Sequence, residues 1–173
     1  EYKSVLDKMV KLYDASTVGD VSIQLVRSEF DVVTNANLGS FVVDVNGADL
    51  HGVRWFELRR SGGGPWGLFQ EGSYAPQNGG ADEHRWNSSI AMDQSGNIAL
   101  GYSISGTGMN ASMRYTGRLP TDAPGTLPQG EDSVITGSGA TGVGRWGDYS
   151  AMVVDPADDC TFWYTSDYVI AGG

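Results

Sequence analysis

The feature that most constrains the fold is the division of the chain, after residue 20, into short runs of alternating apolar and polar residues. Clusters rich in Gly, Asn, Asp and Ser, such as "VNGAD", "DQSGN" and "DPADD", separate these runs. Alternation with a period of two is typical of a strand with one buried face, and such clusters are typical of tight turns. The 25 glycines and the charged fraction of only 18% also favour short strands over long helices. We therefore predict an all-β protein of antiparallel strands joined by short connections.

The predicted strands all lie after residue 20. They are expected at 21–30, 40–45, 52–59, 66–74, 88–93, 97–105, 112–119, 132–137, 149–155 and 160–170. The N-terminal segment, residues 1–20, has a different pattern. A helix over residues 4–13 would gather its apolar side chains on one face, namely Val5, Leu6, Met9, Val10 and Tyr13. We expect a short amphipathic helix there.

Two parts of the chain resemble each other at a spacing of about 60 residues. A shift of 62 places "SSIAMDQSGNIALGYS" (88–103) over "SAMVVDPADDCTFWYT" (150–165) without gaps. A shift of 60 places "VRWFELR" (53–59) over "MRYTGRL" (113–119), and the dipeptide Arg-Trp recurs at 85–86 and 145–146. A repeat of this length that holds four antiparallel strands is typical of a β-propeller blade with generous loops.

This repeat predicts the domain organisation. The region 21–173 would be one propeller-like domain, with blades at about 21–76 and 86–138 and an incomplete blade at 146–173. That is roughly two and a half blades, whereas closed propellers typically need four to eight. Because unpaired edge strands are a liability, we expect either a fragment of a larger protein or sheets that pack as a sandwich.

The order of several motifs carries a resemblance. These motifs are "GVRWFELRR", "YAP", "HRWNSSIAMDQSGNIALGYSIS", "MRYTGRLPTDAPGTLPQGE" and "GRWGDYSAMVVDPADDCTFWYTSDY". Over about residues 40–168 the chain resembles a family of large, mostly uncharacterised secreted bacterial repeat proteins predicted to form β-propellers. The resemblance implies an extracellular or cell-surface module with a binding or structural role. Its partner would be a protein, a glycan or the neighbouring chains of a larger assembly.

Some members of that family carry sialidase-like annotations, so a sialidase-like glycoside hydrolase completed by other blades is the alternative function. Such an enzyme would need an arginine cluster for the substrate carboxylate, a Tyr–Glu nucleophile pair and an acid. Arg54, Arg85, Arg114 and Arg145 supply arginines at the blade spacing. The sequence pattern indicates no nucleophile and lacks the Asp-box motif of that class, so we assign no catalytic residue.

The repeated Arg-Trp positions give the candidate ligand-binding residues: Arg85, Trp86, Arg145, Trp146, Asp148 and Tyr149. An Arg–Asp pair beside a tyrosine could bind a carboxylate or a sugar. The alternative is that Arg and Asp pair with each other while the tryptophans pack between blades. Because the element recurs in both copies, we favour this scaffold interpretation.

The stretch "DPADD" raises the question of a metal. Asp155, Asp158 and Asp159 could bind Ca²⁺, which prefers clustered carboxylates. The same residues also suit a tight hairpin turn, because aspartate accepts hydrogen bonds from its own backbone. The matching stretch "DQSGN" turns without two of the three carboxylates, so we predict a turn and no required cofactor. The alternation predicts that Cys160 points inward with Phe162 and Tyr164.

Charge and hydropathy exclude two classes of partner. The net charge of −10 is unsuited to nucleic acid, which needs clustered Lys and Arg. It is equally unsuited to anionic membranes. No apolar run approaches the roughly 18 residues of a spanning helix, so we expect no membrane insertion.

Overall fold

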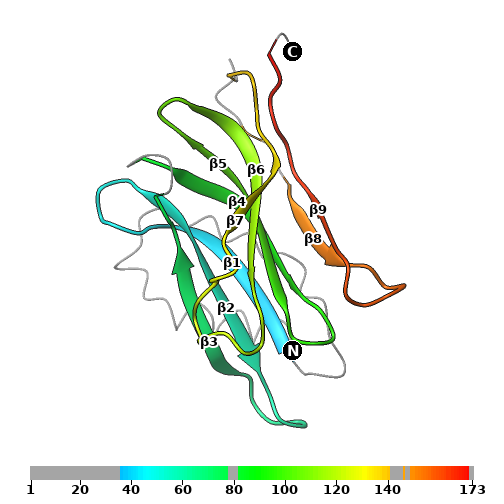
Figure 1. The fold of residues 1–173 in the computed structure, drawn as a ribbon. Helices are drawn as coiled ribbons and strands as arrows, with labels where there is room; N and C mark the ends of the chain where they lie inside the picture. The colour runs from blue at the N-terminus through cyan, green and yellow to red at the C-terminus, as the bar shows by residue number, and fades with distance from the viewer. Residues whose placement is uncertain (1–35, 78–81, 141–145, 147–148, 172–173) are drawn as a thin grey trace.

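The computed structural model describes residues 36–77, 82–140, 146 and 149–171, and within them every regular element is a strand (Figure 1). The strands are β1 (Ala36–Asp44), β2 (His51–Arg59), β3 (Gly67–Tyr74), β4 (His84–Met92), β5 (Ile98–Gly106), β6 (Met109–Arg118), β7 (Glu131–Ile135), β8 (Ala151–Val154) and β9 (Phe162–Thr165). The predicted all-β class and antiparallel pairing are confirmed. The helix expected at 4–13 and the strand expected at 21–30 lie outside the described residues.

The strands form three antiparallel sheets that follow one another along the chain. Sheet A has the order β1-β2-β3, sheet B the order β4-β5-β6-β7, and sheet C the order β8-β9. The first strands of the three sheets are neighbours, because β1 contacts β4 and β4 contacts β8 (Figure 1). The described strands close into neither a barrel nor a complete propeller.

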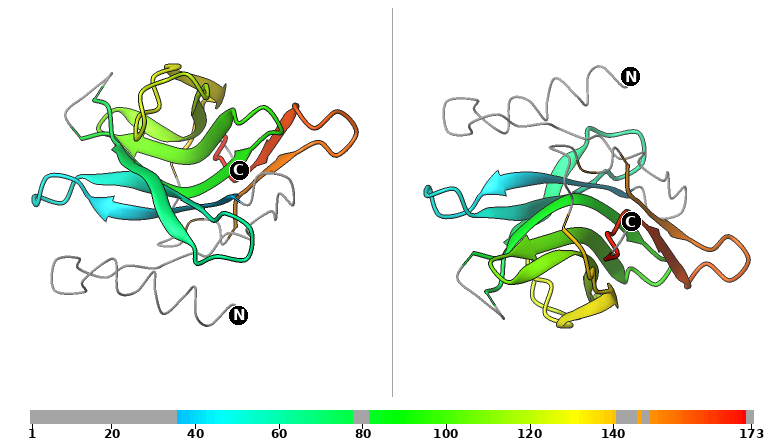
Figure 2. Two further views of the ribbon diagram at one scale, coloured as in Figure 1. Left: turned by 90° about the horizontal axis from the view of Figure 1, so that it is seen from below. Right: turned by 90° about the horizontal axis from the view of Figure 1, so that it is seen from above.

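The main core lies between sheets A and B. In a strand, alternate side chains point to opposite faces, and Val53 and Trp55 of β2 point toward sheet B. They pack against the alternating apolar side chains of β5: Ile98, Leu100, Tyr102 and Ile104. Ile98, Leu100 and Tyr102 are all buried. Figure 2 shows the two sheets as stacked layers.

A smaller core joins sheet C to the opposite face of sheet B. Met152 and Val154 of β8 pack with Ala91, and Phe162 and Tyr164 of β9 pack against them. This face of sheet B carries small residues where sheet C approaches. At Gly101 an added Cβ atom would lie 2.4 Å from Cε2 of Tyr164, closer than van der Waals contact allows. The glycine therefore provides the space that the tyrosine ring fills.

A third apolar cluster lies on sheet A, on the face turned away from sheet B. Phe41, Phe56 and Leu58 form its buried part, and Val43 and Trp66 pack against them. The register places Phe41 opposite Arg54 and Phe56 opposite Gly39, so these side chains alternate with Val53 and Trp55. We call this surface, with its five apolar residues, the outer face of sheet A.

The two copies of the repeat bury corresponding side chains of their first strands, but their turns differ in length. Met152 and Val154 face sheet B, just as Ile90 and Met92 face sheet A, which is what the shift of 62 predicts. The connection between β8 and β9 (155–161) is, however, two residues longer than that between β4 and β5 (93–97). The cross-strand partners therefore cannot all correspond in an alignment without gaps.

Candidate functional site

Arg85 holds a charge inside the protein, between sheets A and B. Its side chain is fully buried on β4. Nε donates to Oε2 of Glu131 at 2.9 Å, and Nη2 donates to Oε2 of Glu83 at 3.1 Å. Nη1 donates to the backbone carbonyl of Glu83 at 3.2 Å. Burial acts to lower the pKa of Arg85, but the hydrogen bond and charge of Glu131 outweigh it and the pKa is raised.

Glu131, at the start of β7, is the acceptor that joins this group. Its carboxylate also receives the hydroxyl of Tyr102 at 2.6 Å and Nη1 of Arg114 at 3.1 Å. The Glu131 side chain is almost entirely buried. We refer to Glu83, Arg85, Tyr102, Arg114 and Glu131 as the buried charge network. Two carboxylates and two guanidinium groups balance one another there, as buried charges require.

The chemistry of the network follows from its burial. Tyr102 is fully buried, and burial, followed by its hydrogen bond to Glu131, raises its pKa far above the usual value for tyrosine. The phenol therefore stays protonated and donates its proton to Glu131. A tyrosine nucleophile would need the opposite shift. The arrangement shown here suits a structural hydrogen-bond network that connects β4, β5, β6 and β7.

Of the arginines at the blade spacing, the three that the structure describes lie in two different places. Arg85 and Arg114 meet at Glu131. Arg54 forms an ion pair with Glu71 at 2.7 Å on the opposite side of sheet A. Arg145 lies outside the described residues.

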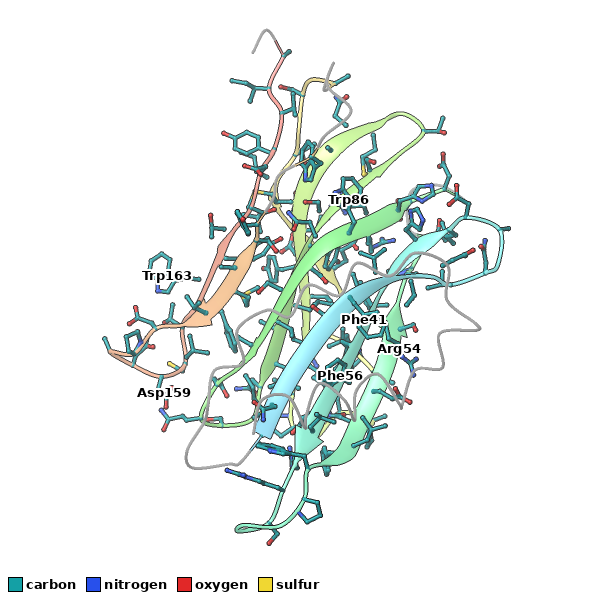
Figure 3. The ribbon with its side chains drawn as sticks, turned by 180° about the vertical axis from the view of Figure 1, so that it is seen from behind. Phe41, Arg54, Phe56, Trp86, Asp159 and Trp163 are labelled. Carbon is teal, nitrogen blue, oxygen red and sulfur yellow. The ribbon has the colours of Figure 1, made fainter. Side chains whose placement is uncertain are left out.

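The two tryptophans of the repeated Arg-Trp pair come together. The rings of Trp86 and Trp146 meet edge to face, with centroids 5.9 Å apart and an interplanar angle of 75°. Nε1 of Trp146 donates to the hydroxyl of Ser103 at 3.1 Å. Trp86 pairs across the strands with Ser103, so the segment before β8 is anchored to β4 and β5. Trp86 lies near the start of β4 and is labelled in Figure 3.

The remaining candidates near sheet C divide into two groups. Tyr149 is 84% exposed and has its phenol ring in solvent. Arg145 and Asp148 fall outside the part of the chain that the structure describes. The Arg–Asp pair expected from the sequence therefore stays a prediction.

The stretch "DPADD" forms a turn, as predicted. Asp155 accepts the amide of Ala157 through Oδ1 at 2.8 Å, and its carbonyl accepts the amide of Asp159 at 2.8 Å. Asp158 accepts the amides of Cys160 and Thr161 through Oδ1. The hydroxyl and amide of Thr161, with the amide of Cys160, lower the pKa of Asp158 to about 2. In the described ranges no three His, Cys, Asp or Glu side chains gather as metal ligands would.

The predicted direction of Cys160 is wrong, because this cysteine is exposed. The turn extends through Thr161, and β9 begins only at Phe162, so Cys160 belongs to the connection and follows no strand alternation. Neighbouring atoms that keep some water from the sulfur, and then the charge of Asp158, raise the pKa of this exposed thiol.

Sheet C presents a surface that the sequence did not single out. Val153 and Trp163 are directly opposite each other on β8 and β9 and face away from sheet B. They are 40% and 60% exposed, and Nε1 of Trp163 donates to Asp155 at 3.0 Å. Figure 3 shows Trp163 projecting from the edge of the molecule. The inward direction predicted for Phe162 and Tyr164 places Trp163 on the opposite face of β9, although tryptophan is a residue type usually found in a core.

Fold and site together define an all-β protein of successive antiparallel sheets with a buried charge network and an exposed aromatic edge. Comparison with known proteins adds no family: no protein-family model matches the chain, and neither do curated proteins or solved structures at the significance required. No helix among the described residues is long and apolar enough to span a membrane.

Proposed function

We propose that this protein is a propeller-like module with a structural and binding role in an extracellular assembly. The observation that carries the proposal is the succession of sheets A, B and C with neighbouring first strands. Blades of a propeller follow one another in this way. The extracellular location rests on the resemblance to secreted repeat proteins.

The binding surface of the module would be sheet C. Sheet B has four strands, whereas sheet C has two among the described residues. A two-stranded sheet is marginally stable by itself, and a strand edge can pair with another chain. Val153 and Trp163 add exposed apolar area beside that edge. The partner that fits is a neighbouring chain that contributes β-strands to sheet C.

Sedimentation velocity over a range of protein concentrations tests this proposal. The expected result is reversible association that Trp163→Glu abolishes, since a carboxylate at the contact would have to be desolvated. Leu119→Glu is the matched control, because Leu119 is an exposed apolar residue away from sheet C, directly after β6. A wild-type chain that stays monomeric at every concentration would contradict the proposal. Binding on a glycan array, lost in Trp163→Glu, would replace the protein partner with a carbohydrate.

A glycoside hydrolase is the second candidate, and one observation favours it. Tyr102 and Glu131 form a hydrogen-bonded Tyr–Glu pair between Arg85 and Arg114, the residue types that sialidase-like chemistry requires. Such a site would have to open, because Tyr102 and Glu131 are buried. A fluorogenic sialoside tests it directly. Turnover that Tyr102→Phe abolishes would support the hydrolase, and absence of turnover by the wild-type protein would exclude sialidase activity.

A further inference from the structure

The outer face of sheet A is buried, although no described sheet packs on it. Phe41, Phe56 and Leu58 are only 8%, 5% and 5% exposed. Sheet B covers the opposite face of sheet A, where Val53 and Trp55 lie. Side chains of this size do not bury themselves on a bare sheet, because one side of each would face water.

Packing within the sheet explains only part of this burial. The ring of Phe56 lies over Gly39, where an added Cβ atom would be 2.3 Å from Cζ. Phe41 packs at an angle against Phe56, with centroids 6.4 Å apart. These contacts cover the sides of the rings that face the sheet and each other. Another part of the chain must cover the rest.

The N-terminal segment is the part of the chain suited to this place. Residues 1–35 end where β1 begins, and Asn37 and Leu58 are cross-strand partners at the edge of the outer face. Within residues 1–35, the stretch 21–30 has the alternation of a strand, whereas residues 4–13 have an apolar row suited to one face of a helix, at Val5, Leu6, Met9, Val10 and Tyr13. The other stretches outside the described residues are short: 78–81 reads "NGGA", 141–145 reads "TGVGR", 147–148 reads "GD" and 172–173 reads "GG".

We propose that residues 4–13 form an amphipathic helix that docks on the outer face of sheet A. Its apolar row would contact Phe41, Phe56 and Leu58, and Lys8 and Lys11 would face solvent. The helix would cover the outer face of sheet A. This goes beyond the binding role proposed for sheet C, because it concerns a different face of the molecule.

Hydroxyl-radical footprinting with mass spectrometry tests this docking in the full chain. The variant Met9→Gln/Val10→Gln makes the apolar row polar, and Lys8→Gln/Lys11→Gln is a matched control on the other side of the helix. We expect oxidation of Phe41 and Phe56 to rise several-fold in the first variant and to stay at the wild-type level in the control. Oxidation of Tyr102 should stay low in both, which distinguishes exposure of this face from unfolding of the whole protein.

Two results would overturn the proposal. One is continued protection of Phe41 and Phe56 in a folded Met9→Gln/Val10→Gln monomer, which would assign the cover to another segment. The other is protection that depends on dimerisation, measured by light scattering, which would assign it to a second copy. If the variant does not fold, a protease site placed at residues 31–35 of the wild-type sequence provides an independent test. After cleavage, the N-terminal fragment should co-elute with the rest of the chain; its separation would contradict the docking.

Discussion

Glu131 shows how one side chain can connect all four strands of a sheet. It accepts from Arg85, Arg114 and Tyr102, which lie on three other strands of sheet B. A carboxylate buried this deeply is tolerated only while its partners remain. Loss of any one partner in this network is therefore costly.

Removing the guanidinium group of Arg85 should therefore lower the free energy of unfolding far more than removing an exposed guanidinium group. We expect Arg85→Met to lower the free energy of unfolding by about 3–5 kcal/mol, because it leaves the carboxylates of Glu83 and Glu131 buried without their main partner. Chemical denaturation measures the difference. Arg54→Met is the control, since Arg54 and Glu71 are 27% and 33% exposed and such pairs contribute about 1 kcal/mol or less. Equal losses in the two variants would contradict the structural role of the network.

A second prediction concerns how the free energy of unfolding depends on pH, through Tyr102. Its pKa in the folded protein is raised by burial and by Glu131, whereas an unfolded tyrosine titrates near pH 10. Above about pH 10 the unfolded chain loses a proton that the folded chain keeps, so the free energy of unfolding falls as pH rises. Tyr164, whose pKa burial raises to about 12, adds to the same slope. Denaturation between pH 8 and pH 11, values chosen around that reference pKa, measures it.

In Tyr102→Phe we expect a shallower decline over the same range. Tyr149→Phe should leave the slope unchanged, because Tyr149 is exposed. A slope in Tyr102→Phe identical to that of the wild type would show that Tyr102 is not held as described.

Among the elements, the β8–β9 turn depends most clearly on one ionised group. Asp158 has its pKa lowered to about 2 by donors from Thr161 and Cys160. Its contribution to the hairpin is therefore complete above the ordinary value near 3.8 and is lost as pH falls through about 2. We expect amide protection in β8 and β9 to decline over this window in the wild type. The decline should be absent in Asp158→Asn and retained in Asp167→Asn, as hydrogen exchange can measure.

The elements also show what a sequence can predict. Strands with clear alternation and a flanking turn, such as 52–59 and 97–105, agree with β2 and β5 to within a residue, because burial of one face dictates both pattern and structure. Near the end of the chain, the predicted strand agrees less well with β9. The alternation in "DDCTFWYT" predicts a strand that includes Cys160, yet the hydrogen bonds of Asp158 extend the turn to Thr161.

The sequence could not predict the buried charge network. Glu131 follows Gly130 in "PQGEDS", which has the composition of an exposed turn. Its burial depends on which strands become neighbours, and no local pattern reports that. Arg85 recurs as Arg145 in the second copy of the repeat, but this recurrence does not indicate which side chains Arg85 contacts. The pairing of Trp86 with Trp146, by contrast, agrees with the expectation that these tryptophans pack between repeats.

At the scale of the whole molecule, stability should be uneven. Sheets A and B share the large core, whereas sheet C rests on a small cluster around Ala91, Met152 and Val154. Regions with few buried apolar contacts open first. We expect native-state hydrogen exchange to show β8 and β9 exchanging well before β2 and β5. Exchange of all four strands at one rate would instead indicate a single cooperative unit.

The adjacent first strands have a mechanical consequence. Each sheet is a meander, so a pull applied between sheet A and Thr165 reaches β9 first. The open end of the β8–β9 hairpin lies at Ala151 and Thr165, which are cross-strand partners, and tension there breaks backbone hydrogen bonds one pair at a time. The β8–β9 hairpin would thus unfold and lengthen at low force, while sheet B, held by the buried charge network around Tyr102, would stay folded.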